Sequence, residues 1–212
     1  MKDVRVRGAR EGEAGQIAAL LVSALGDKYR PALGRDAKGA LERLIADEVR
    51  SGARYLVVAD HIGVLGTVHL STSEDGRGAA GALRRELGPL GALRAIVAWS
   101  LMEPGRIDAD VAYVDELAVA ARGRRRGVAR RLLDACEREA RAMGKRRLML
   151  LVVWENEAAI ALYRKEGFTV TRRRRFRLAR AVFGSRGADV MAKPVAQRPR
   201  DQAARRASSG SS

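Results

Sequence analysis

The stretch from Tyr113 to Leu133, YVDELAVAARGRRRGVARRLL, joins three local patterns that decide the fold. Tyr113 to Val119 favours a strand, and a basic turn follows from Ala121 to Arg126. From Gly127 onward apolar residues recur at helical spacing, which predicts a helix with one buried face. The first amides of a helix lack intrahelical partners and carry partial positive charge. A strand, a glycine-containing turn and a helix in this order therefore predict a phosphate-binding loop.

The spacing inside this loop is Arg124-x-x-Gly127-x-Ala129, which is neither of two better-known phosphate loops, GxGxxG and GxxxxGK[ST]. Small residues at Gly127 and Ala129 would let a pyrophosphate approach the backbone closely. Taken alone, the six-residue pattern is equally compatible with a basic turn that caps an ordinary helix.

Composition favours one domain of moderate size. The hydrophobic fraction of 47% is enough to bury a core, and a single cysteine excludes an intramolecular disulfide. The charged first ten residues lack the apolar segment of a signal peptide, and the longest apolar runs, such as Leu148 to Trp154, are too short to span a bilayer. We therefore expect a cytoplasmic protein without a membrane segment. Two histidines and one cysteine do not predict a metal site.

The net charge of +16 favours association with polyanions, but aromatic residues make up only 4% of the chain, so stacking platforms for single-stranded nucleic acid are scarce. Only weak, non-specific nucleic-acid binding is expected. The charge lies from Arg122 to Arg131, in the run Arg172 to Arg175 and in the C-terminal tail. The tail, residues 196–212, lacks apolar periodicity and is expected to be a disordered basic segment.

Periodicity along the chain predicts alternating strands and helices. A short strand includes Val4 and Val6, and helices follow over about 13–25 and 37–49. A hairpin is expected from strands 55–59 and 63–70, with His61 in the turn. His69 lies in the second strand and could face a pocket, although a lone histidine is more often structural. Further expected elements are a strand over 148–154 buried on both faces, a helix over 157–166, a strand from 168, and an edge strand over 190–193 that Pro194 stops.

Residues 74–110 interrupt this scheme with two expected short helices, one ending near Leu87 and one starting at Pro89. An apolar helical pair needs a surface to cover. It could be a lid over a substrate cleft, a contact in a homodimer, or additional core.

A second motif lies in the segment Trp154 to Phe168, WENEAAIALYRKEGF. This segment resembles the Asn-x-x-Ala-x-x-Leu-Tyr-x-x-x-Gly-Phe motif of the GCN5-related N-acetyltransferases, and Arg124-x-x-Gly127-x-Ala129 resembles their coenzyme A pyrophosphate motif. Every named position is filled, and the motifs are separated by a strand and a helix as in the family. The resemblance covers about residues 3–195, as one domain, and is specific from Tyr113 to Phe168. The insertion at 74–110 departs from the family.

The resemblance implies an α/β acyl-CoA N-acyltransferase fold: a mixed, mostly antiparallel sheet with splayed central strands and flanking helices. It implies that acetyl-CoA binds in the splay, with the pantetheine arm along Leu117, Ala118 and Val119. Asn156 would contact the coenzyme, and Tyr163 would protonate the leaving thiolate. The pyrophosphate would rest on the amides of Arg124, Arg125, Arg126, Gly127, Val128 and Ala129.

The base that deprotonates the acceptor amine is less marked in the sequence. Glu116 is the first choice because it lies on the central strand, and Asp115 is the second; both could instead be surface residues. The glutamate that ribosomal-protein alanine acetyltransferases carry five residues before the asparagine is Leu151 here, which argues against that subgroup.

These observations predict an acetyl-CoA-dependent N-acetyltransferase that acts on a primary amine of a small molecule or a protein. The high positive charge disfavours polycationic acceptors such as polyamines. The alternative is a binding module of the same fold that docks on RNA or an acidic partner through its basic surface, with little catalysis.

Overall fold

The computed structural model describes residues 5–33, 37–75, 85–93, 107–176 and 185–196. Among these residues, seven strands form one open sheet in the order β1-β2-β3-β4-β5-β7-β6. The strands are β1 (Val6–Gly8), β2 (Tyr55–Asp60), β3 (Gly63–Thr72), β4 (Val111–Val119), β5 (Arg147–Val153), β6 (Thr169–Arg175) and β7 (Gly187–Pro194). Neighbours pair antiparallel throughout, apart from the parallel pair β4–β5. The predicted mixed, mostly antiparallel sheet is therefore confirmed.

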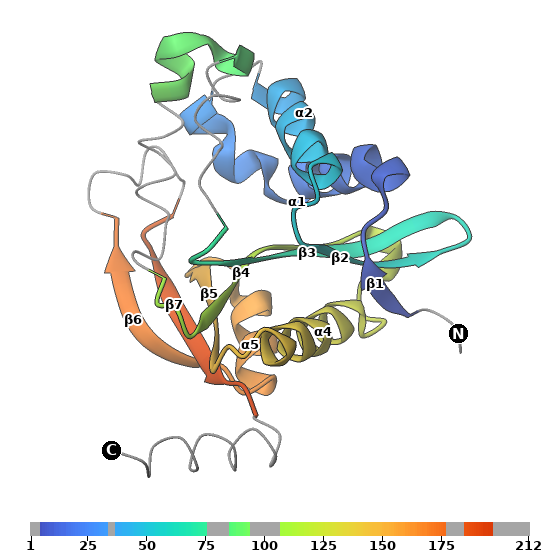
Figure 1. Cartoon of the computed structure of the whole chain (residues 1–212). Coiled ribbons are helices and arrows are strands. Elements are labelled where there is room, and N and C mark those ends of the chain that lie inside the picture. The colour runs from blue at the N-terminus through green and yellow to red at the C-terminus, as the bar shows by residue number, and fades with distance from the viewer. Residues whose placement is uncertain (1–4, 34–36, 76–84, 94–106, 177–184, 197–212) are drawn as a thin grey trace, which may run out of the picture.

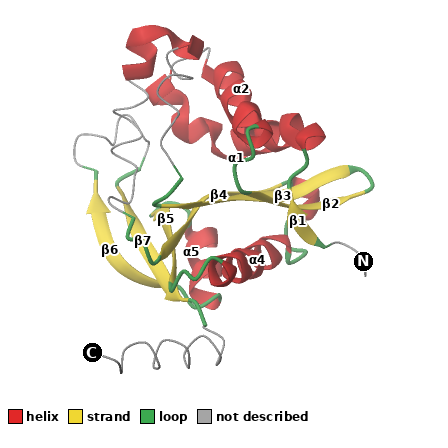
Figure 2. Cartoon of the chain, viewed as in Figure 1, coloured by secondary structure: helices red, strands yellow, loops and turns green. Residues whose placement is uncertain are grey.

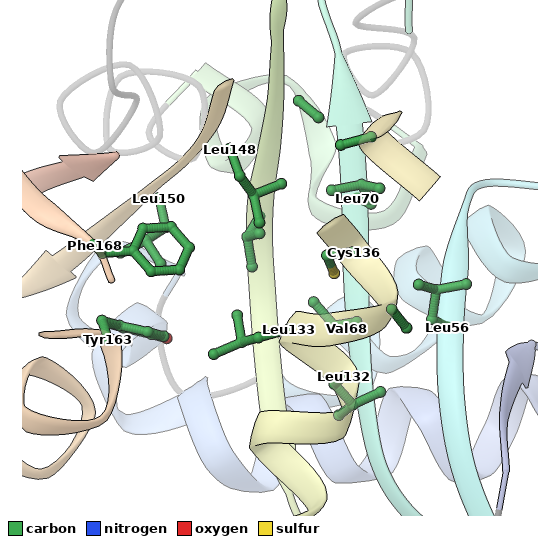
Figure 3. Close-up of a cluster of buried hydrophobic side chains, with 14 of the residues drawn as sticks. Leu56, Val68, Leu70, Leu132, Leu133, Cys136, Leu148, Leu150, Tyr163 and Phe168 are labelled. Atoms are coloured by element: carbon green, nitrogen blue, oxygen red, sulfur yellow. The ribbon is translucent and has the colours of Figure 1, made fainter. Parts of the chain in front are cut away.

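Helices cover both faces of the sheet (Figure 1). Two of them, α1 (Ala14–Leu33) and α2 (Ala37–Arg50), lie on one face, and α4 (Val128–Ala142) and α5 (Glu157–Lys165) lie on the other (Figure 2). The predicted apolar stripe of α4 is buried against the sheet, and Leu132 and Cys136 are fully inaccessible. They pack with Val68 and Leu70 of β3 in the larger core (Figure 3). A second core joins α1 and α2 to the opposite face of β2 and β3.

Three helix boundaries test how well local sequence signals predict where a helix begins or ends. Asn156 caps α5 as predicted, because its side-chain oxygen accepts a hydrogen bond from the Ala159 amide at 3.2 Å. Gly167, at φ +85°, follows the end of α5, as a helix stop should. The first helix, by contrast, runs past the predicted end at residue 25 to Leu33. Helix propensity is a weak prior that tertiary context overrides, so Gly26 did not end it.

The prediction that residues 190–193 form an edge strand is wrong. Strand β7 lies between β5 and β6, and it is buried from Gly187 to Met191. The edge is β6, whose arginines Arg172 to Arg175 form its exposed end. Charged side chains protect an edge from pairing with other chains, which suits β6 to this position. Pro194 ends β7 in either arrangement, so the proline alone could not locate the strand in the sheet.

Strand β5 also differs from its prediction, because only one of its faces is fully buried. Leu148, Leu150 and Val152 are buried in the core under α4 and α5, while the alternate residues are half-exposed. The continuous apolar run therefore does not mark a strand covered on both faces. Its half-exposed face lies on the same side of the sheet as α1 and α2.

The insertion between β3 and β4 is anchored at both stems. The Lys145 ammonium, at 7% exposure, donates to Glu74 Oε1 at 2.8 Å and to the Ala109 carbonyl at 3.0 Å. Arg147 pairs with Asp108 and Asp110, each at 2.9 Å. Between the stems, residues 85–93 are helical, with a left-handed Gly88 at φ +68° before Pro89, where a break was predicted. The remainder of the predicted helical pair and the tail beyond residue 196 lie outside the described residues.

Candidate active site

The two central strands of the sheet diverge. Strands β4 and β5 pair only from Val111 to Val114 and from Arg147 to Leu150. Beyond Val114, β4 continues to Val119 paired with β3, and beyond Leu150, β5 continues to Val153 paired with β7. Their facing backbone groups therefore border a gap that an extended ligand can enter by hydrogen bonding to a strand edge.

Leu117, Ala118 and Val119 lie on the diverged half of β4. Ala118 is buried against the α1/α2 core, while Leu117 and Val119 are half-buried against the α4 core. Their side chains thus fix the strand from both faces. The backbone edge toward β5 is the part of these residues that the gap exposes.

The basic turn after β4 is shaped by left-handed residues. Arg125 has φ +57° and Gly127 has φ +72°. Backbone N–H groups in alternating right- and left-handed conformations converge into an anion-binding concavity. Gly127 is the N-cap of α4, and no side chain caps that end. The first amides of α4 are therefore available to an anion together with the helix dipole.

The backbone conformation adds a second reason for glycine at position 127. A Cβ there would meet no protein atom within 4 Å, so crowding by the chain does not demand glycine. The positive φ does, because a side chain is strained in that conformation. The open space beside Gly127 is where an anion can approach the amides.

Two further glycines, which sequence reasoning did not single out, set the position of this turn. A Cβ on Gly66 of β3 would lie 2.6 Å from Val128 Cγ1, so glycine lets the start of α4 press against β3. A Cβ on Gly123 would lie 2.8 Å from the Leu65 carbonyl oxygen. A glycine inside a strand pattern can mark such a close approach, and this was the available signal at Gly66.

An ion pair also holds the turn against the β2–β3 hairpin. Arg122 donates to both carboxylate oxygens of Asp60, at 2.7 and 2.8 Å. The hydrogen bond from Arg122, with backbone amides of Ile62 and Gly63, lowers the pKa of Asp60 to about 2. The carboxylate is therefore ionised at neutral pH and joins two loops that are far apart in the sequence.

Tyr163 lies on the buried face of α5, with 9% exposure. Its ring is tilted against Phe168 at a centroid distance of 5.8 Å and points from α5 toward Leu133 of α4 (Figure 3). Burial, with a smaller contribution from Cys136, raises the pKa of Tyr163 to about 12. The hydroxyl is therefore protonated at neutral pH, as a proton donor must be. Asn156, at the exposed start of the same helix, is engaged as its cap.

Sequence reasoning missed a cluster on the opposite face of the sheet. In the β3–β4 register His69 pairs with Glu116 and Leu70 pairs with Val114, so Asp115 is an extra residue of a β-bulge. Asp115 is also the first residue of β4 past its pairing with β5. Bulges re-aim side chains and are frequent next to active sites. The two sequence candidates for the base, Glu116 and Asp115, thus both lie opposite His69 where the sheet opens.

Within the described part of the chain, no group of three or more metal-ligating side chains lies together, and no helix is long and apolar enough to cross a membrane.

A sheet that opens in front of an uncapped, left-handed turn defines the class of acyl-CoA N-acyltransferase folds. The chain belongs to the acetyltransferase (GNAT) family, whose model matches residues 40–168, more than half of the sequence. The resemblance inferred from the two motifs is confirmed. No protein of curated function matches the chain in sequence.

Solved structures share this fold over nearly the whole chain. A structure described as an acetyltransferase is 24% identical, with a TM-score of 0.65, over 90% of this chain and 99% of its own. A protein from Corynebacterium glutamicum ATCC 13032, described as histone acetyltransferase HPA2 and related acetyltransferase, is 17% identical, with a TM-score of 0.66, over 92% and 98%. A GCN5-related N-acetyltransferase from Kribbella flavida is 22% identical, with a TM-score of 0.59, over 90% and 97%. At these identities the likeness establishes the fold.

Proposed function

We propose that the chain is an acetyl-CoA-dependent N-acetyltransferase that acts on a primary amine of a small molecule or a protein. The observation that carries the proposal is the divergence of β4 from β5 directly before the left-handed turn at the start of α4. The divergence would admit the extended pantetheine chain, and the left-handed turn would bind the phosphates attached to it. Family membership supports acetyl transfer as the chemistry.

The residues around the gap fit coenzyme A. The backbone of Leu117, Ala118 and Val119 would pair with the pantetheine arm, and the amides from Arg124 to Ala129 would hold the pyrophosphate. Asn156 lies at the start of α5, near the end of β5, where it would contact the coenzyme as well as cap the helix. When bound, acetyl-CoA supplies an activated acetyl thioester.

The two faces of the sheet would bind different substrates, one the coenzyme and the other the acceptor amine. The turn of α4 and Tyr163 lie on the α4/α5 face, so this face would hold the coenzyme, and Tyr163 would give a proton to the leaving sulfur. Glu116 and Asp115 meet His69 toward the α1/α2 face, which leaves that face for the acceptor. Glu116 would draw the acceptor's ammonium group and help to deprotonate it. Three carboxylates, Asp115, Glu48 and Glu116, act electrostatically on His69, although the chain carries +16 overall.

The test combines binding and turnover. Isothermal titration calorimetry should show coenzyme A binding to the purified chain. Thiol release from acetyl-CoA should then be measured with putrescine, lysine methyl ester, tyramine and a peptide with N-terminal alanine. Amine-dependent thiol release with mass-spectrometric detection of the acetylated amine is the expected result. Coenzyme binding without transfer to any amine in the panel would contradict the enzymatic proposal and favour the binding-module alternative.

A further inference from the structure

The His69 imidazole is held at the opening of the sheet by groups from β2 and β4, and α2 holds the β2 group in place. Its ring stacks on the Tyr55 ring of β2, with centroids 4.5 Å apart and planes 14° from parallel. Its Nδ1 lies 3.5 Å from Asp115 Oδ2 on the bulge of β4. The Tyr55 hydroxyl in turn donates to Glu48 Oε2 of α2 at 3.0 Å. The His69 side chain keeps 14% of its surface exposed, so the ring is confined yet accessible.

The Asp115 carboxylate beside Nδ1 favours one tautomer of the imidazole. A neutral imidazole carries one N–H donor and one acceptor nitrogen. With Nδ1–H directed to the Asp115 carboxylate, the lone pair resides on Nε2. A carboxylate that holds an imidazole in this way also stabilises the imidazolium that forms when Nε2 gains a proton.

Resting on the proposed function, we propose that His69 is the group that takes the proton lost by the acceptor amine, and that Asp115 and Tyr55 position its ring. The amine nitrogen forms a bond to the acetyl carbon as the carbon–sulfur bond breaks. The nitrogen passes its proton to His69 Nε2, and Tyr163 supplies a proton to the sulfur that departs with the bonding electrons. Glu116, opposite His69 in the register, attracts the acceptor in its ammonium form and helps that form to release one proton to water before the neutral amine attacks. The second proton is the one that passes to His69.

The electrostatics suit this role. Burial opposes protonation of His69, but the hydrogen bond and charge of Asp115, with the charges of Glu48 and Glu116, outweigh it and raise the pKa of His69 above its ordinary value. A general base works best when its pKa lies near the working pH. An ordinary carboxylate, with a pKa of roughly 4, would be ionised throughout the neutral range and would leave no inflection there.

The experiment is a pH profile of kcat/KM for amine-dependent thiol release, using the amine of the panel above that reacts fastest. For the wild-type protein, kcat/KM should rise with pH and level off, with an inflection above pH 6.5, because His69 must lose its proton to act. His69→Gln should lower kcat/KM by about 10²- to 10⁴-fold and remove this inflection. Asp115→Asn should move the inflection to lower pH, because it removes the largest contribution that raises the pKa. Calorimetry should show unchanged coenzyme A affinity in both.

The chain offers a matched control because it contains only two histidines. His61 lies exposed in the β2–β3 turn, and His61→Gln should keep the wild-type rate and profile. Nuclear magnetic resonance of the imidazole groups in wild-type protein, assigned with this variant, should show His69 in the Nδ1–H tautomer with a raised pKa. This measurement remains decisive if His69→Gln does not fold.

Three results would overturn the inference. His69→Gln could retain the wild-type rate and inflection, the His69 resonances could report the Nε2–H tautomer, or Glu116→Gln rather than His69→Gln could remove the inflection. Each of these leaves the proposed function standing, because amine-dependent transfer by wild-type protein is established first. Coenzyme binding with no transfer in wild-type protein would instead overturn the function and the role of His69 with it.

Discussion

At the scale of single residues, substitutions at Gly127 and Gly144 distinguish the effect of backbone strain from the loss of coenzyme binding. Both have a left-handed φ, +72° and +69°, and a Cβ at either would meet nothing within 4 Å. They flank opposite ends of the same helix, α4. Only Gly127 stands at the end that carries unpartnered amides and the positive end of the dipole.

We expect Gly127→Glu to abolish coenzyme A binding, because its carboxylate would oppose the pyrophosphate at the proposed seat. Gly144→Glu introduces the same charge and comparable strain, so it should lower the melting temperature by a similar amount while leaving binding intact. Calorimetric titration of both variants checks this. Equal affinity of a folded Gly127→Glu variant and wild-type protein would refute the pyrophosphate assignment.

Tyr163 permits a second prediction at this scale. Tyr163→Phe keeps the ring that packs against Phe168 but removes the hydroxyl. General acids are worth about 10²- to 10⁴-fold, so kcat should fall by that factor with coenzyme affinity preserved. Because the pKa of Tyr163 is about 12, its ionisation should cause no loss of kcat with rising pH below about pH 10. A Tyr163→Phe enzyme that turns over at the wild-type rate at every pH would show that the ring only packs.

At the scale of elements, the contact between β3 and the start of α4 determines whether the turn is presented correctly. Gly66 is the point of closest approach, since an added Cβ would lie 2.6 Å from Val128 Cγ1 and 3.1 Å from the Ala118 carbonyl oxygen. Side chains in a packed core cannot yield freely, so extra volume there forces the elements apart.

We expect Gly66→Ala to lower the free energy of unfolding by about 1–3 kcal/mol, as overpacking does, and to weaken coenzyme A binding by displacing the α4 turn. Gly8→Ala is the matched control, because Gly8 also lies in a strand but a Cβ there would meet nothing within 4 Å. Urea unfolding monitored by circular dichroism measures the stability of both variants, and calorimetric titration measures their coenzyme A affinity. Indistinguishable unfolding curves for the two variants would show that β3 and α4 adjust at no cost.

At the scale of the whole molecule, the basic surface includes the arginine run of the edge strand β6. Binding that depends on neutralising phosphates falls steeply with salt, with a slope of log affinity against log salt of roughly −0.7 per phosphate contact on single strands. We expect weak RNA binding at low salt that disappears near physiological salt. At low salt, the Gly127→Glu variant should bind RNA as the wild-type protein does. Fluorescence anisotropy with a labelled single-stranded RNA tests this. Tight binding that resists physiological salt would revive the alternative in which the fold serves as a docking module.

Much of the site was already predictable, because it depends on residues that are neighbours in the chain. The turn from Arg124 to Ala129 follows from glycine chemistry and helix ends, and the cap at Asn156 follows from its side-chain oxygen. The position of Tyr163 on the buried face of α5 follows from helical periodicity. The turn, the cap and the helix face each depend on residues within one or two helical turns of one another. The pairing of strands that are far apart in the sequence therefore does not alter them.

What only the tertiary structure decided is how distant segments meet. The sequence by itself determined the two motifs, the alternation of strands and helices, and therefore the family. It did not determine that β7 enters between β5 and β6, that β4 leaves β5 after Val114, or that a bulge at Asp115 faces His69. Strand order and register arise from hydrogen bonds between segments far apart in the chain, whose partners local patterns do not name. The imidazole cluster exists only once those strands have paired.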